Sequence, residues 1–247
     1  MNKLVVCTHA GDYNSYKHHW DKSGLDFTYL TDVTNTPLDV GLQYDEKRLK
    51  EVLNLQDLQV SKKHYWNSYG NRNIIWFYAH FRMLYYYIQN PGHPYYWFFD
   101  DDVTADNWDV FFDGFKDNNT DFISYFCFKD QQTNALPHIP KIDKNTTSQH
   151  MWFERFPGHG DLLYDDTTQY LGSFFPVVRL SNLALSKLLD IHKQSLYGYS
   201  EGFVPTILNY FGYSVDTIYD NKSQAKHFND SIVKLKHKHG KIDWSWI

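Results

Sequence analysis

Short apolar runs separated by polar residues predict a series of β-strands along this chain. The runs are residues 3–8, 26–30, 95–99, 121–128, 172–179 and 213–218. The run at 95–99 consists only of aromatic residues, which is typical of a central strand buried on both faces. Three aspartates follow it directly.

Between these runs, apolar residues recur at three- and four-residue steps and predict helices over residues 45–55, 73–88 and 202–210, and after Ser181 as far as Leu189. Residues 129–164 lose this periodicity and gain several prolines and glycines, which predicts a long loop. Strands that alternate with helices predict an α/β fold with an open, mostly parallel central sheet flanked by helices. Ligands of such sheets bind beyond the carboxyl ends of the strands.

The composition narrows the class of protein. With 24 Lys and Arg against 29 Asp and Glu, the net charge of −5 argues against a nucleic-acid-binding protein. An aromatic content of 19% excludes a disordered chain. No linker or repeat divides residues 1–247, so we expect one domain. The chain shows no signal peptide or apolar spanning run, so we expect a cytoplasmic protein, with at most peripheral membrane contact through the basic stretch 234–241.

Asp100, Asp101 and Asp102 carry the strongest chemical signal in the sequence. Three like charges at one strand end repel each other, and a bound cation would neutralise them. Asp100 and Asp102 point to the same side of an extended chain, so both can serve one ligand. Their hard oxygens suit Mn²⁺ or Mg²⁺ better than zinc. The alternative is an acidic turn after a strand.

A hydrophobic strand that ends in Asp-x-Asp resembles the metal and nucleotide-sugar motif of GT-A-type glycosyltransferases. The resemblance implies one GT-A-like domain with a Rossmann-like sheet, whose donor half covers about residues 1–105 and whose acceptor half covers about 106–247. It implies a metal-dependent transferase that moves a sugar from a nucleotide diphosphate, preferably a UDP-sugar, to a hydroxyl of a glycan or lipid-linked acceptor. We expect a role in polysaccharide or surface-glycan synthesis.

The same resemblance assigns residues later in the chain. Gly172 and Ser173 match a glycine-containing loop near the acceptor, and Glu201 matches an acidic residue at the start of a helix facing the acceptor. His227 matches a late metal ligand beside Asp100 and Asp102, with His237 and His239 as alternatives. From the residues alone, Glu201 is either a helix cap or the base that deprotonates the acceptor hydroxyl, which favours inversion. With retention it would position the acceptor.

Position along the chain suggests further ligand contacts. Thr8 and His9 end the first predicted strand and Asp32 ends the second, where the nucleotide of GT-A-like proteins lies. Asp101 could join the donor or the metal. Arg72 could bind the diphosphate, and Trp152 could stack on an acceptor sugar.

Two other functions compete with this interpretation. A nucleotidyltransferase also needs carboxylates and Mg²⁺, but it tends to carry a Gly-rich, basic phosphate loop after the first strand, which residues 8–12 lack. A non-catalytic glycan-binding module with Ca²⁺ on the aspartates would need no nucleotide.

Overall fold

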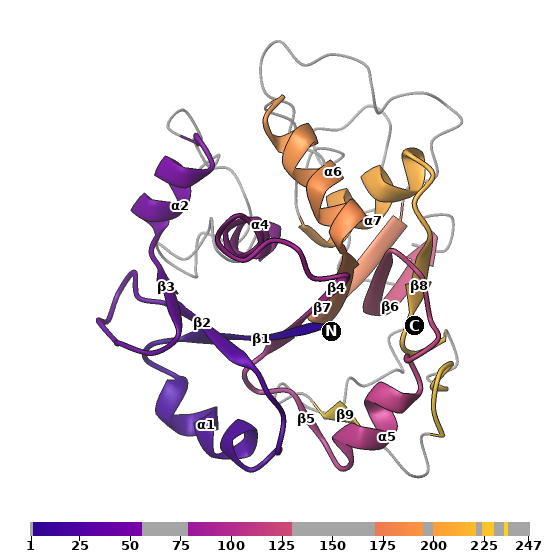
Figure 1. The fold of residues 1–247 in the computed structure, drawn as a ribbon, viewed down its shortest axis with the longest axis horizontal. Coiled ribbons are helices and arrows are strands. Elements are labelled where there is room, and N and C mark those ends of the chain that lie inside the picture. The colour runs from indigo at the N-terminus through magenta and orange to yellow at the C-terminus, as the bar shows by residue number, and fades with distance from the viewer. Residues whose placement is uncertain are drawn as a thin grey trace, which may run out of the picture.

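One mixed sheet organises the chain (Figure 1). The computed structural model describes residues 2–55, 79–129, 171–194, 200–220, 224–229 and 235–236. The seven strands of the sheet are β1 (Lys3–His9), β2 (Thr28–Asp32), β3 (Leu42–Tyr44), β4 (Tyr95–Asp100), β6 (Phe122–Lys129), β7 (Leu171–Ser181) and β8 (Val215–Thr217). Their order across the sheet is β3-β2-β1-β4-β7-β6-β8.

Most neighbouring strands in this sheet are parallel. The pairs β1–β2, β1–β4, β2–β3 and β6–β8 are parallel, whereas β7 runs antiparallel to both β4 and β6. The predicted mixed α/β class with a mostly parallel sheet is therefore confirmed. The chain fills one side of β1 with β2 and β3 and then crosses to place β4 on the other side. Such a reversal of strand order opens a ligand crevice beyond the carboxyl ends of the two central strands, here β1 and β4.

Helices cover both faces of the sheet (Figure 1). One face carries α2 (Glu46–Val52), α4 (Ala79–Gln89), α6 (Asn182–His192) and α7 (Ser200–Tyr210). The other carries α1 (Tyr13–Asp21), α5 (Trp108–Asp113) and a two-stranded ribbon of β5 (Thr104–Ala105) and β9 (Leu235–Lys236). The two groups are called the α4 layer and the α1 layer below.

Strand β4 divides its aromatic side chains between two cores. Tyr96 and Phe98 pack into the α4 layer, and Trp97 and Phe99 pack into the α1 layer. All four are at most 1% exposed. This is the burial on both faces that its all-aromatic sequence predicts.

The predicted strands are present, and the predicted helices differ mainly in length. The helix predicted over 73–88 is described from Ala79 onward, and residues 73–78 lie outside the described residues, as does all but the start of the predicted loop at 129–164. The predicted cap is confirmed, because the Ser181 hydroxyl accepts a hydrogen bond from the Ala184 amide at 3.0 Å. The predicted boundary between donor and acceptor halves stays a prediction.

Five short elements were not predicted from the sequence: α1, β3, β5, α5 and β9. Helix α1 buries only Trp20, so its sequence lacks an apolar stripe. Strand β3 has three residues and α5 has six, too few to show a period. Within the described part of the chain, no helix is long and apolar enough to cross a membrane.

We predict that Gly41→Ala destabilises the fold more than Gly92→Ala. Both glycines have positive φ, +62° and +96°, which costs an alanine about 1–2 kcal/mol. At Gly41 a Cβ would also overlap the backbone carbonyl of Tyr29, whereas at Gly92 it would meet no atom within 4 Å. Urea unfolding of the two variants measures the difference, and equal losses would contradict the steric argument.

Two buried histidines predict that the protein loses stability in mild acid. His80 and His192 are 1% and 6% exposed, and burial lowers the pKa of both below the ordinary 6.5. Because each pKa is lower in the folded chain, these histidines bind more protons in the unfolded chain than in the folded chain at mildly acidic pH. The contribution of these two histidines to the free energy of unfolding therefore falls as the pH drops from about 7.5 to about 5.5.

Urea unfolding at the two pH values tests this prediction. His192→Gln removes the contribution of His192, so its free energy of unfolding should fall less between the two pH values than that of the parent chain. An identical pH dependence in the parent chain and in His192→Gln would refute the assignment.

Candidate functional site

Polar side chains predicted to bind a donor gather at the carboxyl ends of β1, β2 and β4. The register places His9 opposite Asp32 and Cys7 opposite Asp100. Thr8 and Asp101, the next residues of β1 and β4, are joined by a hydrogen bond from the Thr8 hydroxyl to Asp101 Oδ2. Thr8, His9, Asp32, Asp100 and Asp101 therefore share one edge of the sheet. The strand order reverses here between β1 and β4, the position at which open α/β sheets bind their ligands.

His9 and Asp32 form an ordered pair across β1 and β2. Their Nδ1 and Oδ2 atoms are 2.8 Å apart, and the Thr34 amide donates to Asp32 Oδ1 at 2.9 Å. Burial alone would raise the pKa of Asp32, but the bonds from His9 and Thr34 outweigh it and lower the pKa. Asp32 is therefore a carboxylate at neutral pH, and it fixes the orientation of the His9 ring.

Asp100 faces the α4 layer and is paired with an arginine. Arg82 Nη2 of α4 lies 2.6 Å from Asp100 Oδ1. The arginine side chain is 11% exposed and that of Asp100 is 33% exposed. One aspartate of the strand end thus has a cationic partner within the protein.

Asp101 faces the opposite layer. Besides the bond from Thr8, its backbone carbonyl accepts from Trp20 Nε1 of α1 at 2.8 Å, and its amide donates to the Cys7 carbonyl at 3.0 Å. Burial, together with the charges of Asp100 and Asp102, raises the pKa of Asp101 to about 7, against the lowering effect of Thr8. Asp101 therefore gives up its proton less readily than an exposed aspartate does.

The carboxylate oxygens of these residues are suitable ligands for a hard divalent cation, although they do not complete its coordination shell. Carboxylate oxygens are the ligands that Mg²⁺ and Mn²⁺ favour, and Asp102 Oδ1 is a buried oxygen in the same turn. The described residues contain no cluster of three or more His, Cys, Asp or Glu side chains placed to hold a metal. An ion here would need ligands from a bound phosphate and from water as well.

His227 does not join the aspartates in the structure. Its Nε2 lies 3.0 Å from Asp216 Oδ2, Lys226 also pairs with Asp216, and the His227 ring lies 4.6 Å from that of Phe115. Bonds from His227 and Lys226 outweigh burial and hold the pKa of Asp216 well below its usual range.

The strand register explains why His227 is remote. Asp216 pairs with Ile123, Ile123 with Arg179, and Arg179 with Trp97, so Asp216 lies three strands from β4 and three residues short of Asp100. At about 4.8 Å between strands, three strands span about 14 Å. The placement of His227 thus differs from the expected ligand set. His237 and His239 lie outside the described residues.

Glu201 lies at the start of α7, against β7. Its Oε1 accepts from the Phe175 amide at 3.3 Å, and its carbonyl accepts from the Ser173 hydroxyl at 2.9 Å. Because β7 is antiparallel to β4 and Val177 pairs with Phe99, Ser173 and Phe175 lie beyond the carboxyl end of β4. Glu201 therefore lies at the same end of the sheet as the aspartates.

Gly172 and Ser173 occupy a strand and not the loop expected from the resemblance. Both are buried in β7 and pair with Phe128 and Cys127 of β6. The strand predicted over residues 172–179 already includes both residues, and β7 extends it by one residue at its start and by two at its end. Their part in acceptor binding stays a prediction. Arg72 and Trp152 lie outside the described residues.

Two residues of this region were missed from the sequence: Arg82 and Trp20. Arg82 is a single cation within an otherwise apolar helix, and that contrast was the available signal. Trp20 lies in the last turn of the otherwise polar helix α1, and nothing in the neighbouring sequence points to Asp101.

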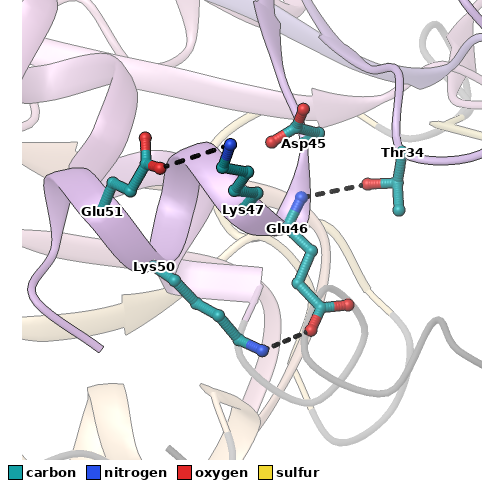
Figure 2. A pocket seen from close by; sticks show the side chains of 6 residues that line it. All are labelled: Thr34, Asp45, Glu46, Lys47, Lys50 and Glu51. Atoms are coloured by element: carbon teal, nitrogen blue, oxygen red, sulfur yellow. Dashed lines mark hydrogen bonds and ion pairs between the residues drawn. The ribbon is translucent and has the colours of Figure 1, made fainter. Parts of the chain in front are cut away.

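An open pocket of about 610 Å³ lies beside this site, at the ends of β2 and β3. Figure 2 shows its lining residues: Thr34, Asp45, Glu46, Lys47, Lys50 and Glu51. Lys50 pairs with Glu46 at 2.7 Å and Lys47 with Glu51 at 3.9 Å, so these charges are compensated within the pocket. Thr34 is two residues beyond Asp32, so the pocket adjoins the end of β2 that carries Asp32.

Comparison with known proteins gives little beyond this geometry. No family model and no curated protein matches the chain. One similar solved structure is a glycosyltransferase involved in the glycosylation of the major capsid of PBCV-1, with 9% identity, a TM-score of 0.38, and coverage of 99% of this chain and 98% of that chain. Another is mouse xyloside xylosyltransferase 1 in its apo form, with 10% identity, a TM-score of 0.39, and coverage of 87% and 78%. At these scores and identities, neither assigns a role to any residue.

We predict that Trp20→Phe costs more stability than Trp97→Phe. Both indoles are at most 1% exposed, and the two substitutions remove the same atoms. Trp20 Nε1 donates to Asp101, whereas Trp97 Nε1 has no hydrogen-bond partner among the described residues. Loss of the first bond leaves a buried carbonyl without its donor, worth about 1–3 kcal/mol.

Urea unfolding of the two variants measures this difference. Equal destabilisation would show that the Trp20 bond contributes nothing to holding the turn at Asp101.

Proposed function

We propose that this chain is a metal-dependent glycosyltransferase. It would move a sugar from a nucleoside diphosphate donor, preferably a UDP-sugar, to a hydroxyl of a glycan or lipid-linked acceptor in polysaccharide or surface-glycan synthesis. The observation that carries the proposal is the gathering of Asp100, Asp101 and the His9–Asp32 pair at the carboxyl ends of β1, β2 and β4, with Glu201 at the same end of the sheet.

The donor would lie over the carboxyl ends of β1 and β4. Open α/β sheets bind nucleotides at such a reversal of strand order. The His9–Asp32 pair and Thr8 offer hydrogen-bonding groups for a base or ribose there. Their mutual contacts hold these groups in place before a ligand arrives, which lowers the entropy lost on binding.

A divalent cation would be held by Asp100 and Asp102. Three consecutive carboxylates repel one another, and a bound cation would relieve that repulsion. Bound Mn²⁺ or Mg²⁺ would supply charge neutralisation of the leaving diphosphate. Because His227 is bonded to Asp216, its predicted role as a further ligand is not part of this proposal.

Glu201 would be the base. The amide of Phe175 holds one of its oxygens, and a carboxylate at the first turn of a helix is favoured as an anion. As the acceptor oxygen attacks the anomeric carbon, the bond from that carbon to the diphosphate breaks. The hydroxyl proton passes to Glu201, and the nucleoside diphosphate leaves with the bonding electrons. This single displacement inverts the anomeric centre.

We predict that UDP binds the parent chain in the presence of Mn²⁺ and that chelation abolishes binding. Asp102→Ala should weaken UDP binding at least tenfold, because Asp102 would no longer help to hold the cation that neutralises the diphosphate. Asp117→Ala, which removes an exposed carboxylate outside the site, should leave the affinity unchanged. Isothermal calorimetry with UDP, and with GDP in parallel, measures each effect.

The same titrations separate the competing functions. Binding of GDP in place of UDP would change the donor and keep the reaction class. If folded protein binds neither nucleotide, the glycosyltransferase proposal fails. Glycan binding with Ca²⁺ and without nucleotide would then indicate a binding module.

A further inference from the structure

Arg82 is a charged side chain in a position that the fold otherwise fills with apolar groups. All residues of α4 from Ala79 to Tyr86 are buried, and the whole Arg82 residue is 9% exposed. Removing a guanidinium from water costs several kcal/mol unless a hydrogen-bonded anion compensates it. The cost calls for an account of what Arg82 contributes.

The anion that compensates Arg82 is Asp100. Among the described residues, the other ionisable groups beside the guanidinium are Cys7 and Tyr44. Burial raises the pKa of the Cys7 thiol to about 12 and also raises that of Tyr44, so both are neutral at physiological pH. The 2.6 Å contact with Asp100 Oδ1 is therefore a charge-assisted bond inside a neutral, tightly packed surrounding.

Hydrogen bonds to Ser200 hold in place the helix α4 that carries Arg82. Near its start, the His80 amide donates to the Ser200 hydroxyl oxygen at 3.1 Å, and His80 Nδ1 lies 2.8 Å from the same oxygen. Ser200 precedes Glu201 in the chain, so one buried helix contacts the segment that carries Glu201 and, through Arg82, the end of β4.

A second buried arginine shows that the fold can hold a guanidinium without a directly bonded carboxylate. Arg179, 1% exposed, donates to the Thr120 carbonyl at 2.9 Å and to Asn118 Oδ1, and it lies 4.4 Å from the ring centroid of Tyr95. Its neighbours across the sheet are Trp97 and Ile123, away from the carboxyl end of β4. Arg179 therefore serves packing, and it provides a matched comparison for Arg82.

We propose that Arg82 is a positioning residue for Asp100: it holds one carboxylate oxygen, so that the exposed remainder of this carboxylate meets the donor and its cation in a single orientation. This assignment rests on the proposed function. The fork of the guanidinium fixes direction as well as charge, which a lysine ammonium does not.

Calorimetry of UDP with Mn²⁺ on Arg82→Met, Arg82→Lys and Arg179→Met tests the assignment, with thermal melting to confirm that each variant is folded. Arg82→Met should lose about 10–100-fold in UDP affinity, as is typical when a residue that supports a metal ligand is removed. Arg82→Lys should recover part of the loss. Arg179→Met should bind UDP within about twofold of the parent chain even if its melting temperature falls, because Arg179 does not touch Asp100.

If Arg82→Met does not fold, Arg82→Lys, which keeps the charge and removes the fork, supplies the affinity comparison. Folded Arg82 variants that bind UDP as tightly as the parent chain would overturn the assignment and leave the proposed function intact. A parent chain that binds neither UDP nor GDP would overturn the proposed function, and this assignment with it.

Discussion

The concentration of negative charge at the end of β4 is the constraint on which the rest of the site depends. Three carboxylates follow a strand that is buried on both faces, and the backbone sends two of them to opposite layers. Asp100 turns to Arg82 in the α4 layer, and Asp101 turns to Thr8, with its carbonyl on Trp20 of the α1 layer. The protein therefore neutralises only part of the charge, and the remainder favours a cation at the crevice between β1 and β4.

The aromatic content of the chain follows from the same architecture. In a sheet covered on both faces, central strands need apolar groups on both sides, and β4 meets that need with aromatic residues alone. Trp20, Trp108 and Phe111 fill the α1 layer around Phe99. These large rings explain how helices as short as α5, with six residues, pack firmly against the sheet.

The sequence predicts the strands and the long helices because the local spacing of their apolar residues shows which positions are buried. Thr8, His9, Asp32, Asp100 and Asp101 could be grouped in advance because parallel strands that end together bring their next residues together. The position of His227 could not be predicted in this way, because it depends on which strand pairs with β8 and on how the chain returns to Asp216. The antiparallel direction of β7 and the pairing of Arg82 with Asp100 are likewise tertiary facts, with no local pattern that specifies them.

Because the end of β4 is hydrogen-bonded to both layers, neither layer can be replaced by that of another protein without loss of a bond to β4. A helix taken from another α/β protein could match the length and apolar surface of α4 and still leave Asp100 without its arginine. A transplanted α1 could likewise leave the Asp101 carbonyl without its indole donor. Chimaeras of this fold would therefore have to exchange each layer together with the strand residues that it holds, and recombination between relatives would be tolerated best at boundaries far from residues 100–102.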